Sequence, residues 1–220
     1  MRTDPLSDTL GFLLATQGDQ VGLGPWRWVM MALFAALVLG GLIVAATAWT
    51  ADAAQRTGRD LGIFAARVLI GLMWFQNLFW KLPLFSTENG LYYWTGEEVK
   101  NAAFPLHGRL IETLILPTPN FLFVDVAVFL VELAFAACLI LGVGVRLVGV
   151  VGVLFVAQLW LGLYRHPQEW PWSYVFLMTL MGLFALLGAG RSLGLDGMLR
   201  RSHPPHLTNG AVAAFVRVAT

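Results

Sequence analysis

Apolar residues in this chain gather in five long runs, which are separated by segments rich in polar or aromatic side chains. The runs cover residues 28–49, 61–80, 121–143, 145–164 and 172–189. A helix of about 20 apolar residues crosses the hydrocarbon core of a membrane, which is about 30 Å thick. The pattern therefore predicts an all-α membrane protein with five transmembrane helices in contact with the lipid bilayer.

The segments between the runs divide the chain into three parts. We expect an N-terminal extension with the first span at 1–60, a four-helix membrane domain at 61–200 and a polar tail at 201–220. A long external loop, 82–119, interrupts the membrane domain. Within this loop, residues 108–116 mix polar and apolar side chains at the spacing of a short helix on the membrane surface.

Two short motifs affect how the spans are joined. Ala51-Asp52-Ala53 resembles a signal-peptidase site, but the apolar run before it is longer than that of a signal peptide, so we expect the first span to be retained. The turn Gly142-Val143-Gly144 is short enough to join only two antiparallel helices. Gly149 and Gly152 follow it and allow close approach of a neighbouring helix.

The lysines and arginines predict the orientation of the spans. If the links alternate between the two sides, 50–60, 142–146 and the C-terminal tail share one side with eight Lys and Arg residues, and six lie on the other side. Positively charged residues accumulate on the cytoplasmic side of membrane proteins. We therefore expect an external N-terminus and a cytoplasmic C-terminus.

Composition agrees with a membrane protein and excludes several kinds of site. Of the 220 residues, 58% are hydrophobic and only 12% are charged, compared with about 25% charged in a typical soluble domain. The net charge of +1 and the lack of basic runs argue against nucleic-acid binding. One cysteine, Cys138, cannot hold an iron–sulfur cluster or zinc, and no two histidines face each other within the spans to ligate a haem.

Glu132 is the most unusual polar residue of the spans, because it lies near the middle of the run 121–143. A carboxylate at this depth costs on the order of several kcal/mol and is usually paired, protonated or functional. At about 1.5 Å per residue, Arg67 of the second span lies within about 5 Å of the same depth. We predict an Arg67–Glu132 ion pair that either locks the helices or forms a catalytic or proton-binding site. Alternatively, Arg67 reaches toward the headgroups and Glu132 is protonated.

Five further polar side chains fall in the outer half of the predicted spans: Gln76, Asn77, Lys81, Asp125 and Gln158. Asp125 precedes Glu132 by seven residues, so both lie on one helix face. Together these groups are expected to line a polar cleft that opens outward and binds a substrate. Each of them alone also fits an ordinary hydrogen bond between helices.

Three residues outside the spans are further candidates: His107 in the long loop, and His166 and Trp170 in the turn between the fourth and fifth spans. Tryptophan at this position is typical of the aromatic belt of membrane proteins. The two histidines face the same side of the membrane, but their spacing matches no metal-binding motif, so no metal site is predicted.

From Arg67 onward the chain resembles the DoxX/DoxD family of small four-helix membrane proteins, over residues 61–200. The resemblance lies in the order and spacing of four motifs. These are Arg67-Val-Leu-Ile-Gly71 before Trp80-Lys81, Ile111-Glu112-Thr-Leu-Ile-Leu-Pro117, Glu132-Leu133 before Leu141-Gly142 and Arg146, and Gly190-Arg-Ser-Leu-Gly-Leu-Asp196. The first span lies outside the four-helix core of the family and looks like an addition.

The resemblance implies a protein of the prokaryotic cytoplasmic membrane. DoxD-like members are the small subunit of thiosulfate:quinone oxidoreductase, which passes electrons from thiosulfate to membrane quinone together with a partner subunit. For this chain it implies a quinone-binding oxidoreductase subunit. Gln76, Asn77, Trp80 and Lys81 would then contact the headgroup, and Glu132 would provide a proton route.

Two other functions fit the same pattern. Other DoxX-like members are membrane partners of redox enzymes, so a non-catalytic accessory subunit of a larger energy-converting membrane complex is the main alternative. The additional first span and the glycine-lined helix faces agree with that role. A small transporter ranks last, because the cytoplasmic half of the spans shows only Arg67 and Arg146 as polar groups for a path through the membrane.

Overall fold

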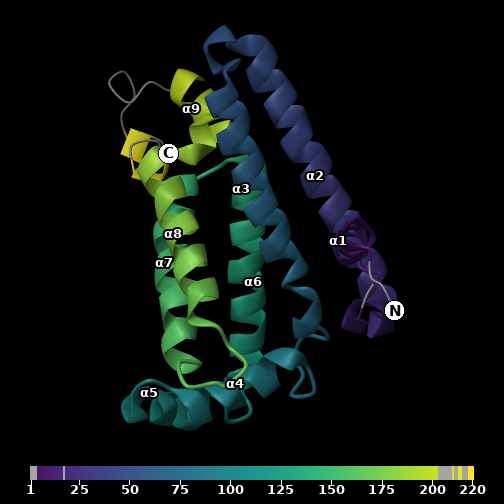
Figure 1. Ribbon diagram of the computed structural model, residues 1–220, viewed down its shortest axis with the longest axis vertical. Helices are drawn as coiled ribbons and strands as arrows, with labels where there is room; N and C mark the ends of the chain where they lie inside the picture. Colours follow the sequence, from purple (N-terminus) through teal and green to yellow (C-terminus); the bar gives the residue numbers. More distant parts are fainter. Residues whose placement is uncertain (1–3, 17, 203–209, 211–212, 215–217) are drawn as a thin grey trace. The chain divides into compact units, whose positions relative to one another are not determined.

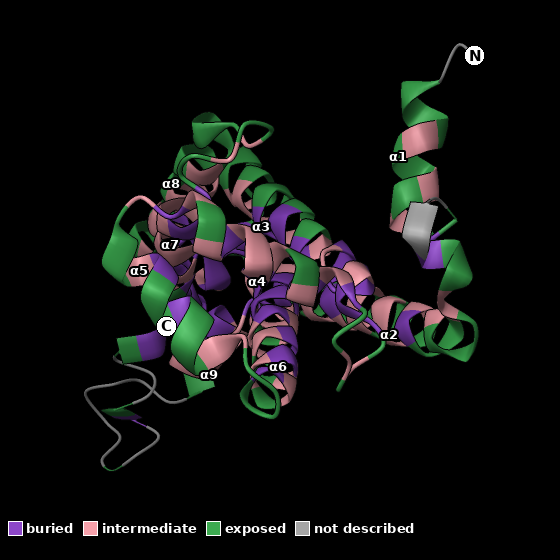
Figure 2. Cartoon of the chain, turned by 90° about the horizontal axis from the view of Figure 1, so that it is seen from below, coloured by how far each residue is buried: buried purple, intermediate pink, exposed green. Residues whose placement is uncertain are grey.

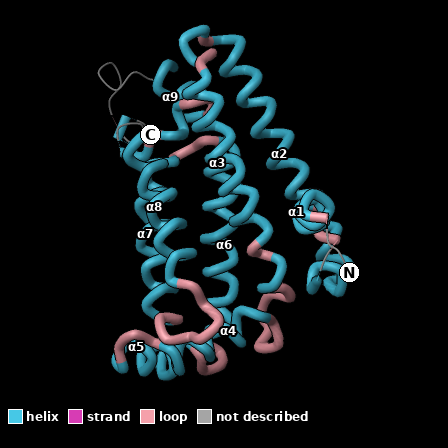
Figure 3. The backbone as a smooth tube through the Cα atoms, viewed as in Figure 1, coloured by secondary structure: helices cyan, strands magenta, loops and turns pink. Residues whose placement is uncertain are grey.

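The computed structural model describes residues 4–16, 18–202, 210, 213–214 and 218–220, and every regular element in this part of the chain is helical (Figure 3). Within these residues, four helices are long and apolar enough to cross a membrane. They are α2 (Pro25–Ala51), α3 (Gly58–Gln76, continued as an apolar segment to Lys81), α6 (Asn120–Leu141) and α7 (Val145–Gly162). These helices indicate a multi-pass membrane protein, and the predicted all-α class is confirmed.

The fifth predicted span corresponds to α8 (Pro171–Leu187), an apolar helix of 17 residues. At about 1.5 Å per residue it measures about 26 Å, slightly less than the hydrocarbon core of about 30 Å. The helix ends at Leu187 because Gly188 has a φ of 58°, a left-handed conformation that glycine adopts readily. A fifth crossing by α8 stays a prediction.

The remaining helices are short: α1 (Pro5–Leu13), η1 (Gly18–Leu23), η2 (Ala53–Gln55), η3 (Phe79–Lys81), α4 (Gly90–Asn101), α5 (Pro105–Leu110), η4 (Ile111–Ile115), η5 (Ala189–Arg191) and α9 (Leu195–Ser202). The predicted helix at 108–116 is observed as α5 followed by the π-helical turn η4. α4, which precedes α5 in the chain (Figure 1), was not predicted. It begins where the side chain of Asn89 accepts a hydrogen bond from the Tyr92 amide at 3.1 Å.

Packing divides the chain into two compact units. Unit 1 comprises Met1–Ala35, Leu72–Ala134 and Gln158–Pro171, and unit 2 comprises Ala36–Gly71, Phe135–Ala157 and Trp172–Thr220. The four long helices each contribute residues to both units. Most of the predicted tail, 201–220, lies outside the described residues.

Aromatic side chains form much of the core of unit 1. Phe75 and Phe121 are fully buried. The ring of Phe34 lies 5.1 Å from that of Phe75, and Tyr92 of α4 meets Phe121 of α6 edge to face at 4.8 Å. These contacts fix α4 against the start of α6. By contrast, α1 has no buried residue, and Figure 2 shows only intermediate and exposed positions along it.

Glycines determine the packing of unit 2. The α6–α7 turn contains Gly142 and Gly144 with φ of 70° and 61°, which confirms the predicted hairpin. Along α7, a Cβ on Gly149 would come within 2.5 Å of the Met181 carbonyl oxygen of α8, so the two backbones are in direct contact. Gly152 also faces Met181. The predicted close approach at both glycines is therefore confirmed.

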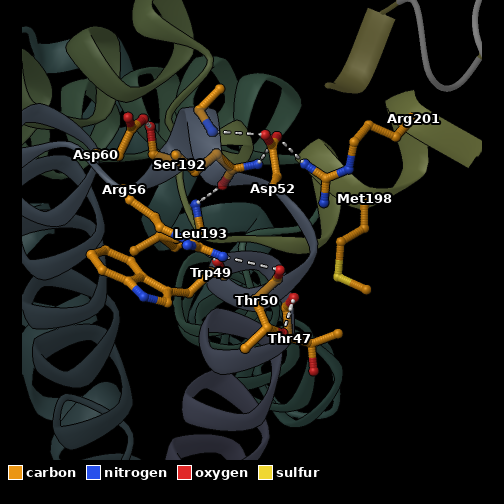
Figure 4. Close-up of polar contacts among 12 residues, drawn as sticks. Thr47, Trp49, Thr50, Asp52, Arg56, Asp60, Ser192, Leu193, Met198 and Arg201 are labelled. Atoms are coloured by element: carbon orange, nitrogen blue, oxygen red, sulfur yellow. Dashed lines mark hydrogen bonds and ion pairs between the residues drawn. The ribbon is translucent and has the colours of Figure 1, made fainter.

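Polar side chains fasten the α2–α3 connection of unit 2 to the segment after η5 (Figure 4). The Ser192 hydroxyl donates to the Asp60 carboxylate at 2.7 Å, and Arg201 of α9 forms an ion pair with Asp52 at 2.7 Å. Asp52 lies in the connection and Asp60 in the first turn of α3, and both partners come from the last part of the chain. These bonds hold α9 close to the start of α3.

Candidate functional site

Lys81 and Glu132 form a buried ion pair in unit 1. Lys81 is the last residue of η3, which follows α3, and Glu132 lies in the middle of α6. The ammonium Nζ is 2.7 Å from Oε2 of the carboxylate, and the two side chains are 0% and 2% exposed. Removing one partner from such a pair leaves an uncompensated charge away from water, which is strongly unfavourable. Each of the two residues therefore depends on the other to remain charged.

Asn77 and Trp80 complete the immediate surroundings of this pair. Lys81 Nζ donates to the Asn77 carbonyl at 2.8 Å and lies 3.7 Å from the centroid of the Trp80 ring. The Asn77 amide donates to Glu132 Oε2 at 3.1 Å and accepts from the Trp80 indole N–H at 2.7 Å. The ammonium is thus stabilised both by an anion and by an aromatic face.

Asp125 is connected to the ion pair through the side chain of Asn89. Its carboxylate is fully buried and accepts hydrogen bonds from the Asn89 amide at 3.0 Å and from the Phe85 backbone N–H at 2.8 Å. Asn89 also donates to the Lys81 carbonyl at 2.9 Å, which connects Asp125 to the ion pair. We call these residues the Lys81 cluster: Asn77, Trp80, Lys81, Asn89, Asp125 and Glu132.

The Lys81 cluster combines one ammonium with two carboxylates, so its fully ionised form carries one net negative charge. A proton or a cation bound there would neutralise this charge. The cluster also holds the side-chain amides of Asn77 and Asn89 and the indole N–H of Trp80, which are kinds of donor suited to a carbonyl oxygen. Such a set of groups can donate hydrogen bonds and exchange protons.

The predicted Arg67–Glu132 pair is wrong. Glu132 binds Lys81, whereas the fully buried guanidinium of Arg67 in unit 2 donates to the carbonyl of Leu139, and to that of Ile140 at 3.3 Å. These carbonyls belong to the last turn of α6, where no partner is available within the helix. Arg67 thus caps a helix end. The prediction failed because equal depth does not determine which side chains face each other.

Arg67 also organises residues from other sequence motifs in unit 2. A Cβ on Gly142 would come within 2.8 Å of Arg67 Nη1, so glycine is required for the guanidinium to fit. The carboxylate of Asp196 accepts from the backbone N–H groups of Gly144 at 2.7 Å and Val145 at 3.1 Å. Burial raises the pKa of Asp196, while these hydrogen bonds and the charge of Arg67 act in the opposite direction. The arrangement balances a buried cation with a nearby acid and stabilises the α6–α7 turn.

The five residues of the predicted outward cleft do not all gather at one site, but have separate partners in unit 1. Asn77, Lys81 and Asp125 belong to the Lys81 cluster, but the other two predicted members have different partners. Gln76 donates to the Leu13 carbonyl at 2.8 Å and accepts from Gln20 at 2.9 Å, which ties it to the N-terminal segment. Gln158 donates to Glu98 of α4 at 2.8 Å. Gln76 and Gln158 therefore form ordinary interhelical hydrogen bonds. This is the alternative to a shared cleft that the sequence already offered for each of them.

The candidates outside the spans also have distinct surroundings. His107 Nε2 lies 3.8 Å from Glu98 Oε2, and His166 Nε2 lies 3.8 Å from Glu97 Oε2. Trp170 is exposed. Among the described residues there is no group of three or more His, Cys, Asp or Glu side chains that could hold a metal ion.

Glu98 is a candidate that the sequence analysis missed. It is 8% exposed, and burial raises its pKa to about 7, although the hydrogen bond from Gln158 acts in the opposite direction. A usable signal is present in the sequence: Leu91, Thr95 and Glu98 follow the spacing of one helix face, and all three are buried in α4. Asn89 before Gly90 is also a typical helix start.

Comparisons with family models, with characterised proteins and with solved structures found no match for this chain. The relationship to the DoxX/DoxD family therefore rests on the four sequence motifs and stays a prediction. The geometry of the Lys81 cluster is independent of that resemblance.

Proposed function

We propose that this protein is a five-span membrane subunit that binds the headgroup of a quinone at the Lys81 cluster. A partner subunit that oxidises a sulfur compound such as thiosulfate supplies the electrons. The proposed setting is the prokaryotic cytoplasmic membrane, with the N-terminus outside. The observation that carries the proposal is the ion pair of Lys81 and Glu132, which is fully buried between apolar helices and surrounded by Asn77 and Trp80.

The residues of the cluster suit the proton chemistry of quinone reduction. Reduction to the quinol takes up two electrons and two protons at the carbonyl oxygens. The Lys81 ammonium and the Trp80 indole are donors for such an oxygen, and Glu132, which lies 2.7 Å from the ammonium, can exchange a proton with it. The ring of Trp80 provides a flat apolar surface beside these donors.

One observation favours a second function, that of a non-catalytic accessory subunit. Lys81, Asn77 and Trp80 already donate hydrogen bonds to Glu132 or to each other. A satisfied network of this kind can hold helices in register without a ligand. In that case the chain stabilises a larger membrane complex, and the Lys81 cluster only fixes its fold.

Quinone binding to the purified protein in detergent micelles separates the two functions. A short-chain ubiquinone serves as the probe, and quenching of tryptophan fluorescence reports its binding. The test variant is the double substitution Lys81→Met and Glu132→Gln, which removes both buried charges together. The matched control, Lys100→Met and Glu97→Gln, makes the same changes at the exposed Lys100–Glu97 pair, whose atoms are 2.6 Å apart.

We expect the test variant to bind the quinone at least tenfold more weakly, because hydrogen bonds from charged donors contribute about 1.5–3 kcal/mol. We expect the control to bind it with unchanged affinity. Equal affinities in both variants, with helical content preserved by circular dichroism, contradict quinone binding at this site. That result would leave the accessory function.

A further inference from the structure

A second buried polar cluster lies in unit 1, outside the Lys81 cluster and outside the proposed quinone site. α4 contributes Glu98, α5 contributes His107, and α7 contributes Gln158. Gly162 of α7 lies directly over the Glu98 carboxyl group and leaves no room for a Cβ. A carboxyl group is thus enclosed by three helices.

Polar atoms of Gln158 and His107 both approach one oxygen of the Glu98 carboxyl group. The Gln158 amide donates to Glu98 Oε2 at 2.8 Å, and His107 Nε2 lies 3.8 Å from the same oxygen. His107 Nε2 is buried and has no hydrogen-bond partner among the described residues. A protonated carboxyl oxygen can accept one hydrogen bond and donate another. An approach of about 1 Å would bring the carboxyl and the imidazole to normal hydrogen-bond distance.

We propose that Glu98 and His107 form a proton-binding site that holds α5 against α4 and α7. In mildly acidic solution the proton resides on Glu98 Oε2, which accepts from Gln158 and donates to His107 Nε2. In more alkaline solution the proton passes to water, and the carboxylate that remains becomes hydrated as α5 separates from α4. The inference does not depend on the proposed quinone site.

The charged side chains on the elements next to α4 are exposed or bound to other partners. Burial is the main cause of the high pKa of Glu98, about 7. Of the charged residues on the elements that pack against α4, Arg109 of α5 and Glu112 of η4 are exposed, and Lys81 of η3 is bonded to Glu132. The proton on Glu98 is therefore held by exclusion of water and by the contacts with Gln158 and His107.

α5 is a short helix with one face packed against α4 and the other face open. It has six residues, and its inner face meets α4 where a Cβ on Gly108 would come within 2.7 Å of the Val99 carbonyl oxygen. Its outer face is open, and the Leu106 side chain is 69% exposed. Loss of the hydrogen bond between Glu98 and His107 would remove a polar attachment on the inner face.

The first experiment measures the proton itself. The full-length protein is labelled with ¹³C at the glutamate carboxyl carbons and titrated in micelles from about pH 5.5 to about pH 8.5, a range that brackets a pKa of about 7. The signal of Glu98 is assigned by its loss in Glu98→Gln. We expect a midpoint near 7, lowered by about half to one pH unit in His107→Phe, because the neutral carboxyl loses its acceptor.

The second experiment measures the movement of α5. A spin label at Leu106→Cys, in a Cys138→Ala background, reports the mobility of the helix by electron paramagnetic resonance. We expect mobility to rise with the same midpoint in the parent and to be constant in Glu98→Gln. Glu97→Gln is the matched control, because the hydrogen bond from Lys100 lowers the pKa of Glu97, and it should retain the full transition.

Either experiment can overturn the proposal. The first does so if the Glu98 signal has no midpoint in this range, or if the midpoint rises in His107→Phe. The second does so if the spin-label spectrum stays constant in the parent, or changes equally in the parent and in Glu98→Gln.

Discussion

At the scale of single residues, the central feature is that one buried acid is matched by one buried base. Glu132 is recognisable from the sequence, because a carboxylate in the middle of an apolar run needs a partner. Its partner is not recognisable, because Lys81 stands at the end of the apolar run, where a lysine is normally expected to reach water. The turn η3 keeps Lys81 inside the protein, and only the three-dimensional structure shows this.

A double-mutant cycle measures the strength of this pair. We expect Lys81→Met and Glu132→Gln each to lower the free energy of unfolding, with Lys81→Met costing about 3–5 kcal/mol because it leaves Glu132 without its cation. The double substitution should cost less than the sum of the single ones, because no unpaired charge remains. Denaturant unfolding in mixed micelles provides the values. Additive losses would show that the two side chains do not interact.

The raised pKa of Glu98 predicts that the free energy of unfolding depends on pH. The pKa of Glu98 is raised from its ordinary value of 4.5 to about 7, so the folded protein binds this proton more tightly than the unfolded chain. The resulting stabilisation is complete below about pH 4.5 and is lost as the pH rises through 7, by up to about 3 kcal/mol in total. The free energy of unfolding, measured between about pH 5 and pH 8, should fall in the parent and change much less in Glu98→Gln. A parallel decline in both proteins would assign the effect to another group.

At the scale of elements, the long helices and the α6–α7 turn follow directly from apolar runs and glycine positions. α4 was missed because its sequence is only weakly apolar and its start depends on the cap by Asn89. The predicted cleft divided into separate sets for a similar reason: Gln158 faces α4, an element absent from the prediction. A pattern along the chain identifies polar groups, but the helix that each one faces depends on packing.

Two glycines test the packing of α7 against α8. A Cβ on Gly149 would come within 2.5 Å of the Met181 carbonyl oxygen, whereas a Cβ on Gly182 has its nearest contact at 3.7 Å, an ordinary distance. Gly149→Ala should therefore lower the free energy of unfolding by about 1–3 kcal/mol. Gly182→Ala should be neutral or slightly stabilising, because alanine favours helix. Equal effects of the two substitutions in the same unfolding assay would contradict the backbone contact.

At the scale of the whole molecule, the number of crossings decides where the two ends of the chain lie. In the part of the chain that the structure describes, four helices meet the length of a span, and α8 with 17 residues is slightly shorter. If α8 also crosses, the termini lie on opposite sides of the membrane; if it does not, they lie on the same side. The distribution of lysine and arginine favours an external N-terminus.

Cysteine labelling in intact cells tests this topology. In a Cys138→Ala background, we expect Ser7→Cys to react with a membrane-impermeant maleimide, and Ser202→Cys to react only after the membrane is opened. This result follows from five crossings with the predicted orientation. Labelling of both cysteines from outside would show that the chain crosses an even number of times.

Photoaffinity labelling tests directly whether the Lys81 cluster binds a quinone headgroup. An azido-ubiquinone is irradiated with the purified protein, and the modified peptides are identified by mass spectrometry. If the cluster binds the headgroup, we expect labels within residues 74–91 and 125–135, and we expect these labels to be lost when unmodified ubiquinone competes. Labels that are spread over lipid-facing residues of α2 and α8 and are unaffected by competition would contradict quinone binding at the Lys81 cluster.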